Sequence, residues 1–232
     1  MAASWRPGPS HARTTVSPAA PISTRLAGKE LTRQSLVSAA LTLLSQSSFD
    51  SLSLREVTRE AGITPTAFYR HYDDMEELGL VLVAESFASL GAMLKDARAE
   101  SRFDEDAIHR SLAVVVRHMH DHTAHFRFIA RERYGGVRRL RQAINRELTV
   151  FADELAADLT AVPGVDNWTL EDRRMLAGVI TETIIRMVAE LLESEPGDEG
   201  SIVARTERQL RLISLGVPAW DVAMEPRHGF SE

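Results

Sequence analysis

The chain has 232 residues, a formal net charge of −6 and 44% hydrophobic side chains, values that fit a folded protein with a sizeable core. It contains no cysteine, which excludes disulfides, iron–sulfur clusters and zinc sites built on thiolates. No run of about 18 apolar residues occurs, so we expect no membrane-spanning helix and a cytoplasmic protein. The acidic balance is unlike that of proteins that coat nucleic acid through charge alone. Any DNA binding therefore has to come from a local surface.

Residues 1–28 differ in composition from the rest of the chain. They hold three arginines and four prolines but no acidic residue. Such a segment buries too little apolar surface to offset the entropy of ordering it. We therefore predict a flexible basic arm. A function for this arm would consist of additional phosphate contacts beside a DNA site.

From Glu30 onward, the apolar residues repeat at the spacing of an α-helix. A first helix is predicted to end near residues 45–48. A short second helix begins at Ser53, because Ser53 and Glu56 have the spacing of a capping box. We expect Gly62 to end this helix, since glycine readily adopts the positive φ found at helix C-termini.

A third short helix is predicted from Thr64 to about Tyr72, with Thr64 as its N-cap and Pro65 in its first turn. The second helix, the tight turn and this third helix have the spacing of a helix-turn-helix, whose second helix lies in the DNA major groove. The first turn is small and polar, so its backbone can approach the bases, while Phe68 and Tyr72 are expected to pack inward. The alternative is an ordinary helical hairpin with aromatic packing.

The remainder of the chain is predicted to be a helical body. Asp73 and Asp74 are expected to cap a long helix that continues to about Arg98. No strand is expected, because β-branched residues do not alternate in runs between turn residues. The sequence thus predicts an all-α fold with a flexible arm (1–28), a three-helix head (29–75) and a body (76–232). Further helices are predicted at 105–120, 124–134, 137–161, 169–194 and 199–216.

The stretch from Leu52 to Leu78 reads Leu-Ser-Leu-Arg-Glu-Val-Thr-Arg-Glu-Ala-Gly-Ile-Thr-Pro-Thr-Ala-Phe-Tyr-Arg-His-Tyr-Asp-Asp-Met-Glu-Glu-Leu. It resembles the DNA-binding head of TetR-family transcriptional regulators. The resemblance implies a prokaryotic homodimeric repressor, each subunit joining a helix-turn-helix head to a helical body that binds a small molecule. It implies an inverted-repeat operator in double-stranded DNA, with no enzymatic activity and no cofactor. One departure is Met75, where many members have a lysine that contacts phosphate.

Carried over to this sequence, the resemblance assigns DNA contacts to the second and third helices. Arg55 falls where several members place an arginine that reaches guanine. Ser53, Tyr69 and His71 match phosphate contacts in the family. Arg70 also carries donors suited to phosphate oxygens. The positions that match residues facing the bases are Thr64, Pro65, Thr66 and Ala67.

Part of the body resembles a narrower branch, the FabR- and DesT-like regulators. The resemblance lies in residues 126–133, in Gly135, and in Arg138 and Arg141. It implies control of lipid genes, notably those for unsaturated fatty acid synthesis, in response to acyl thioesters. We therefore expect a long-chain acyl-CoA as effector. Two alternatives remain open: a repressor of the same fold with another hydrophobic effector, such as a drug, steroid or flavonoid, or a helical adaptor whose head does not bind DNA.

A fatty chain requires a long apolar channel, for which the body offers flexible and aromatic side chains. Arg131 and Arg133 begin a dense set of arginines suited to the phosphates of a carrier group. The alternative is that the apolar residues are ordinary core and that the arginines form a solvated face. The apolar residues predicted to line the channel are Phe87, Met93, Met119, Phe126, Phe128, Phe151 and Met187.

Dimerisation is predicted through residues 169–216. The helix 169–194 is apolar around most of its circumference, which indicates burial on all sides, and residues 199–216 are its expected partner. Ile184 and Val188 are expected at the dimer contact. The alternative is a core helix within one chain.

A histidine cluster precedes the branch motif. His118, His122 and His125 have the spacing of one helix face that could present ligands to a metal. A helix end predicted near Asp121 would separate them. We therefore expect no metal site.

Overall fold

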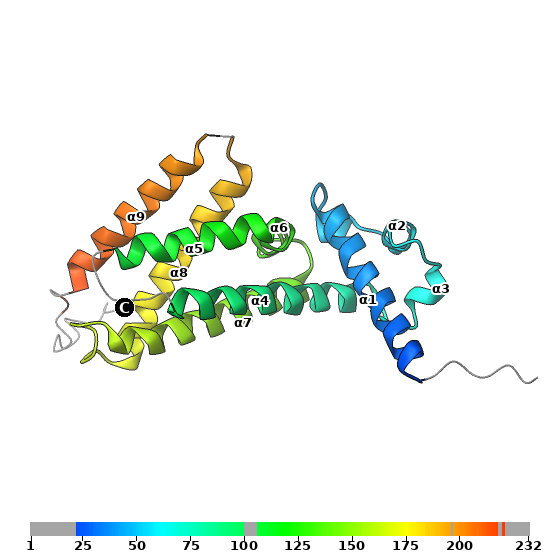
Figure 1. The fold of residues 1–232 in the computed structure, drawn as a ribbon, viewed down its shortest axis with the longest axis horizontal. Helices are drawn as coiled ribbons and strands as arrows, with labels where there is room; N and C mark the ends of the chain where they lie inside the picture. Colours follow the sequence, from blue (N-terminus) through cyan, green and yellow to red (C-terminus); the bar gives the residue numbers. More distant parts are fainter. Residues whose placement is uncertain (1–21, 100–105, 196, 218–219, 221–232) are drawn as a thin grey trace, which may run out of the picture.

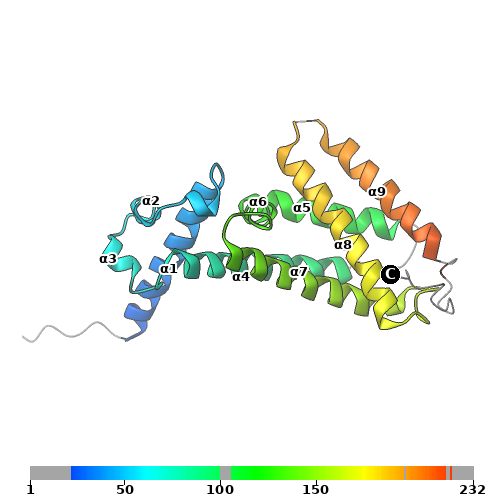
Figure 2. The same ribbon diagram turned by 180° about the vertical axis from the view of Figure 1, so that it is seen from behind.

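The computed structural model describes residues 22–99, 106–195, 197–217 and 220, with side chains from residue 27 onward except those of 92–99. Over these residues the chain forms nine α-helices and two short 3₁₀ helices. Figures 1 and 2 show an elongated molecule in which α1, α2 and α3 form a head at one end. The long helix α4 leaves the head and runs through the body.

The head contains α1 (Ile22–Leu44), α2 (Leu54–Glu60) and α3 (Pro65–Phe68), with a 3₁₀ turn, η1 (Phe49–Ser51), between the first two helices. The beginning of α1 corrects the predicted boundary of the arm, because residues 22–28 are helical. The last proline of the arm is at position 21, so nothing in the following residues interrupts a helix. Residues 1–21, the rest of the predicted arm, lie outside the described residues.

The predicted starts of the second and third helices and the turn at Gly62 between them are confirmed. The Ser53 side chain accepts from the Glu56 amide, and the Glu56 side chain accepts from the Ser53 amide, which completes the capping box. Gly62 has a φ of 68°. Thr64 accepts from the Ala67 amide at the start of α3. The third helix ends at Phe68, earlier than predicted, and the chain continues to residue 72 in hydrogen-bonded turns.

The predicted body helices are confirmed to within a few residues. The Asp74 carboxylate accepts from the Glu77 amide at the start of α4. No helix in the described part of the chain is long and apolar enough to cross a membrane. The bounds are α4 Met75–Ala99, α5 Ala107–Asp121, α6 Thr123–Glu132, α7 Arg138–Asp158, η2 Leu159–Ala161, α8 Leu170–Glu193 and α9 Glu199–Gly216.

One hydrophobic core extends from the head into the body. Phe68 and Tyr72 pack inward as predicted and belong to the same buried cluster as Leu78 and Leu82 of α4. That cluster continues into α5, α6, α7, α8 and α9. A smaller cluster around Trp168 joins the end of α7 to the beginning of α8. The head is therefore continuous with the body, which allows a change in one to reach the other.

The surface of α8 differs from the prediction. The helix buries Met187, Val188 and Leu191, but Met175 and Val179 are 49% and 46% exposed. Within the single chain this face is not covered, because α7 and α9 pack on other sides of the helix. Burial on all sides therefore stays a prediction that depends on a second copy of the chain. Val188 packs in the core of its own chain rather than at an outer contact.

Candidate DNA-binding head and its junction with the body

The outer surface of the head carries polar and aromatic side chains over a closed interior. Phe68 is fully buried, whereas the adjacent Tyr69 is 61% exposed, and the two rings meet edge to face at 5.6 Å. The phenol therefore points away from the core with its hydroxyl available to a partner. Six of the predicted DNA-contacting residues are exposed beside it or on α2: Ser53, Arg55, Thr64, Pro65, Thr66 and Arg70. Ala67 is half-buried on the same short helix.

Two predicted phosphate contacts have constraints that the sequence did not reveal. The Ser53 hydroxyl donates to Glu56 Oε2 at 2.7 Å and its amide donates to the same oxygen at 3.0 Å, and these bonds lower the pKa of Glu56. A phosphate at Ser53 would therefore lie close to an ionised carboxylate. His71 is half-buried, and burial, followed by Lys29 and Arg70, lowers its pKa. Its imidazole is thus a neutral donor near pH 7 rather than a cation.

The beginning of α4 lacks a cation for the DNA backbone. Met75, where the resembled family often has lysine, is half-buried and packs against the core. Lys29 on α1 is exposed, and its charge acts on His71 of the helix-turn-helix. Sequence reasoning missed Lys29 as a candidate. The available signal was that it is one of only two lysines in the chain.

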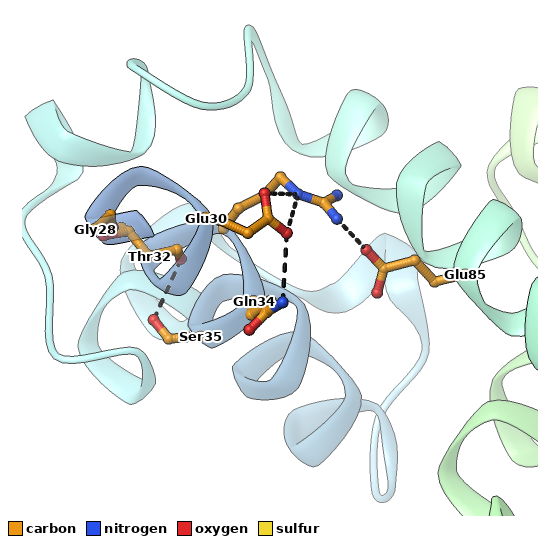
Figure 3. A network of polar contacts seen from close by, with 7 residues as sticks. Gly28, Glu30, Thr32, Gln34, Ser35 and Glu85 are labelled. Carbon is orange, nitrogen blue, oxygen red and sulfur yellow. Dashed lines mark hydrogen bonds and ion pairs between the residues drawn. The ribbon is translucent and has the colours of Figure 1, made fainter. Parts of the chain in front are cut away.

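A network of polar contacts joins α1 to α4 (Figure 3). Arg33 Nε contacts Glu30 Oε1 at 3.2 Å on its own helix, and Arg33 Nη2 reaches Glu85 Oε1 on α4 at 2.9 Å. Gln34 donates to the same Glu30 carboxylate at 3.4 Å. Because α4 continues into the body, this ion pair constrains the angle between the head and the body.

A second set of contacts joins the end of α1 to α6. Arg131 Nη1 donates to the carbonyl oxygens of Leu44 at 3.1 Å and Ser47 at 2.7 Å. Leu44 is the last residue of α1 and Ser47 lies just after it, where carbonyl oxygens have no intrahelical donors. The neighbouring Glu132 accepts a 2.9 Å hydrogen bond from the Phe49 amide. The end of α6 thus contacts α1 and η1 side by side.

The apolar residues predicted to line an acyl channel pack against one another. Phe87 of α4 and Phe151 of α7 meet edge to face, with ring centroids 6.0 Å apart. Met93 lies outside the residues with described side chains. The other four predicted liners are buried in the same cluster: Met119, Phe126, Phe128 and Met187. In this conformation the channel lining is therefore a packed core.

The arginines predicted to gather at a channel mouth are spread over separate contacts. Arg131 faces the head, whereas Arg133 pairs with Glu182 of α8 and stacks over the Tyr134 ring. Arg139 of α7 contacts Glu76 at 3.2 Å. Residues two apart on a helix point in widely different directions, so Arg131 and Arg133 do not share a face of α6. The arginines predicted to bind the phosphates of a carrier group therefore do not form one cluster in this structure.

An open groove of about 870 Å³ lies along α8 and α9, with Arg133 and Tyr134 at the end of α6 among its lining residues. Met175 and Val179 line it on α8, and Leu212 lines it on α9 with 71% of its surface exposed. Most of the residues that line the groove belong to 169–216, the predicted dimer interface.

The predicted break in the histidine cluster is present. The helix α5 ends at Asp121 and α6 begins at Thr123, with His122 between them. The Nδ1 atom of His125 lies 2.9 Å from Ser86 Oγ on α4. Burial, followed by the charge of His122, lowers the pKa of His125. Among the described residues, no group of three or more His, Asp or Glu side chains is arranged to hold a metal ion.

Residues 36–80 match the sequence model of a family described as "Bacterial regulatory proteins, tetR family". The chain has the head and the fold of the TetR family. The match begins within α1 and ends just inside α4, so it covers the helix-turn-helix and its supporting helices. The helical body after residue 80 lies outside this match.

Solved structures with this fold include a transcriptional regulator from Rhodococcus sp. Rha1, with a TM-score of 0.64 and 15% identity over 82% of this chain and 99% of that chain. The fatty acid degradation regulator FadR from Bacillus halodurans has a TM-score of 0.63 and 13% identity, over 77% and 94%. FadR from Bacillus subtilis, solved in complex with stearoyl-CoA, has a TM-score of 0.62 and 16% identity, over 78% and 96%. At these identities the likeness shows the TetR-type fold.

Proposed function

We propose that the protein is a dimeric transcriptional repressor that binds an inverted-repeat operator. One observation carries this proposal: Arg55, Thr66 and Tyr69 are exposed on a head that matches the TetR family, while Phe68 is fully buried beneath them. Guanidinium, hydroxyl and phenol groups are donors suited to base edges and phosphates. Arg55 is assigned to guanine and Tyr69 to phosphate. Lys29 supplies a phosphate contact in place of the lysine that Met75 replaces.

The groove along α8 and α9 is proposed to hold the second copy of this chain. Its exposed apolar residues, Met175, Val179 and Leu212, form a surface that a monomer would leave in water. A two-fold axis through such a surface places the same groove of each subunit against its partner. Two heads related by that axis then meet two half-sites separated by whole helical turns of DNA.

A long-chain acyl-CoA is the proposed effector. The support is the set of aromatic and methionine side chains in the core between α4, α5, α7 and α8, among them Phe87, Phe151, Met119 and Met187. Such side chains change rotamer to accommodate an alkyl chain. The ligand would have to separate them, and it would regulate the operator only if it binds the separated form more tightly than the packed one.

A second candidate is a hydrophobic effector without phosphates. The observation in its favour is that Arg131, Arg133 and Arg139 are engaged with carbonyls or carboxylates of the chain itself. A ligand that needs only the apolar core would not have to displace these contacts. Separate titrations with palmitoyl-CoA and with free palmitate distinguish the two candidates.

The test combines a band-shift assay with calorimetry. DNA flanking the gene is mixed with the purified protein, and palmitoyl-CoA, oleoyl-CoA, CoA alone and free palmitate are titrated separately. We expect a shifted band whose stability changes with acyl-CoA but not with CoA alone. Binding of palmitate equal to that of palmitoyl-CoA would favour the phosphate-free effector. Absence of binding by every ligand below about 100 μM, or an operator affinity that no ligand changes, would refute the acyl-CoA proposal.

A further inference from the structure

A buried carboxyl group lies at the joint between the head and the body. Glu132, the last residue of α6, is 1% exposed. Its Oε1 accepts a 2.9 Å hydrogen bond from the Phe49 amide, which lies 83 residues earlier in the chain. Its Oε2 is also buried and has no hydrogen-bond partner among the described residues. An ionised carboxylate would bury a net charge at this unpaired oxygen, whereas a neutral carboxyl would not.

Burial and the nearby Asp50 carboxylate oppose the ionisation of Glu132. Burial is the main influence that raises the pKa of Glu132; the Phe49 amide lowers it, the facing Asp50 carboxylate on η1 raises it, and Arg131 lowers it. The Arg131 guanidinium donates to two carbonyls at the end of α1, so it does not form an ion pair with Glu132. The carboxyl therefore faces an acid on the head and has no salt-bridge partner among the described residues.

The loop after α6 lies close to both carboxyl groups and covers that of Glu132, whereas Asp50 remains exposed. A Cβ atom on Gly135 would lie 2.2 Å from Glu132 Oε2, and one on Gly136 would lie 2.5 Å from Asp50 Oδ2. Arg141 of α7 fixes this loop by donating to the carbonyls of Gly135 at 2.6 Å and Gly136 at 3.0 Å. Water cannot reach Glu132 to hydrate a charge unless the loop or η1 moves away.

We propose that Glu132 is a positioning residue for the DNA-binding head: its neutral carboxyl holds η1 and the end of α1 against α6, and loss of its proton loosens this joint. A loosened head must be ordered again when the dimer engages both half-sites, which lowers operator affinity. Operator affinity therefore falls as the pH rises through the titration of Glu132. This inference rests on the proposed repressor function.

The sign of the stability effect follows from proton counting. The unfolded chain releases this proton near the ordinary glutamate value of about 4.3, while the folded chain keeps it to higher pH. Between these two values the folded state binds more protons, so the free energy of unfolding falls as the pH rises. Glu132→Gln retains a carbonyl oxygen for the Phe49 amide but cannot ionise. The stability and operator affinity of this variant should therefore lack the pH dependence that Glu132 contributes.

The experiment compares the full-length wild type with Glu132→Gln and with Glu193→Gln, an exposed glutamate at the end of α8 that serves as the control. Three quantities are measured from about pH 4.5, close to the ordinary glutamate value, to about pH 8.5. They are the free energy of unfolding in urea, the amide exchange of residues 44–51 (which include the Phe49 amide) corrected for intrinsic rates, and the anisotropy of a labelled duplex from the DNA flanking the gene.

In the wild type and the control, we expect operator affinity to fall several-fold and exchange at the joint to accelerate as the pH rises. Glu132→Gln should match the wild type at the acidic end and exceed it at the alkaline end in all three measurements. Parallel profiles for all three proteins would overturn the proposal. A flattened stability profile with an unchanged affinity profile would overturn the positioning role. If no duplex is bound at any pH, the repressor function fails, and amide exchange alone decides whether the proton of Glu132 holds the joint.

Discussion

Gly79 offers a direct test of how tightly the head packs against the body. It lies in α4, where Phe49 of η1 and Leu140 of α7 close over the helix. A Cβ atom at this position would lie 2.6 Å from Phe49 Cζ and 3.0 Å from both Leu140 methyl carbons. Phe49 and Leu140 are buried, so neither can move into solvent to relieve the clash. We expect overpacking by Gly79→Ala to cost about 1–3 kcal/mol of unfolding free energy.

Gly91 provides a matched control in the same helix. A Cβ atom there would meet no described atom within 4 Å. Alanine in place of glycine inside a helix stabilises by about 0.5–1 kcal/mol, and this gain applies to both variants. The difference between Gly79→Ala and Gly91→Ala therefore isolates the packing cost. We expect Gly79→Ala to be the less stable of the two by about 1–3 kcal/mol.

The assay is urea unfolding followed by far-UV circular dichroism at one fixed protein concentration, because association shifts apparent stability. Tryptophan fluorescence provides a second probe for two-state behaviour. Equal unfolding free energies for the two alanine variants would show that Phe49 and Leu140 do not close over Gly79. The continuity of the core between head and body would then be refuted at this point.

Val179→Glu, in the groove, should convert the dimer into a monomer in sedimentation. Val150→Glu, at a residue on α7 that is 51% exposed and outside the groove, should leave the dimer intact. Wild-type protein that is monomeric at micromolar concentration would contradict this prediction. Arg55→Ala should cost about 1–3 kcal/mol of operator binding and relax the preference at one base pair per half-site. Tyr69→Phe should weaken binding evenly across sequences, and the reverse pattern would show that the two roles are misassigned. Burial lowers the pKa of His125, so the stability that the neutral imidazole contributes is present above the ordinary histidine value of about 6.5 and is lost as the pH falls. His125→Asn should therefore reduce the loss of unfolding free energy at acidic pH in urea unfolding. A pH profile of stability that does not change in this variant would refute the prediction.

Local signals in the sequence were sufficient to predict the head. A capping box, a positive-φ glycine and a Thr-Pro helix start act within a few residues, so each can be recognised without knowing the fold. Ser53, Gly62 and Thr64 are examples, and the structure confirms all three. The helix breaks at His122 and after α7 were also predictable, because the signals for them lie within a few residues of each break.

Contacts between distant residues could not be predicted in this way. Arg131 contacts Leu44 across 87 residues, and Glu132 contacts Phe49 across 83. In the sequence, Arg131 is one of several arginines near a branch-like motif, and nothing local indicates that it contacts the end of α1. The exposed face of α8 could not be predicted either, because apolar composition does not reveal which sides of a helix its neighbours cover. Val179 and Val188 have the same side chain but opposite surroundings.

The measurement that tests the central claim most directly is selection of bound duplexes from a random DNA pool by the full-length protein. The repressor account predicts an inverted repeat whose half-site centres are about one or more helical turns apart, with a guanine whose selection disappears in Arg55→Ala. Recovery of no preferred sequence at about 100 mM salt, or of a single asymmetric site that Arg55→Ala reads equally well, would contradict it.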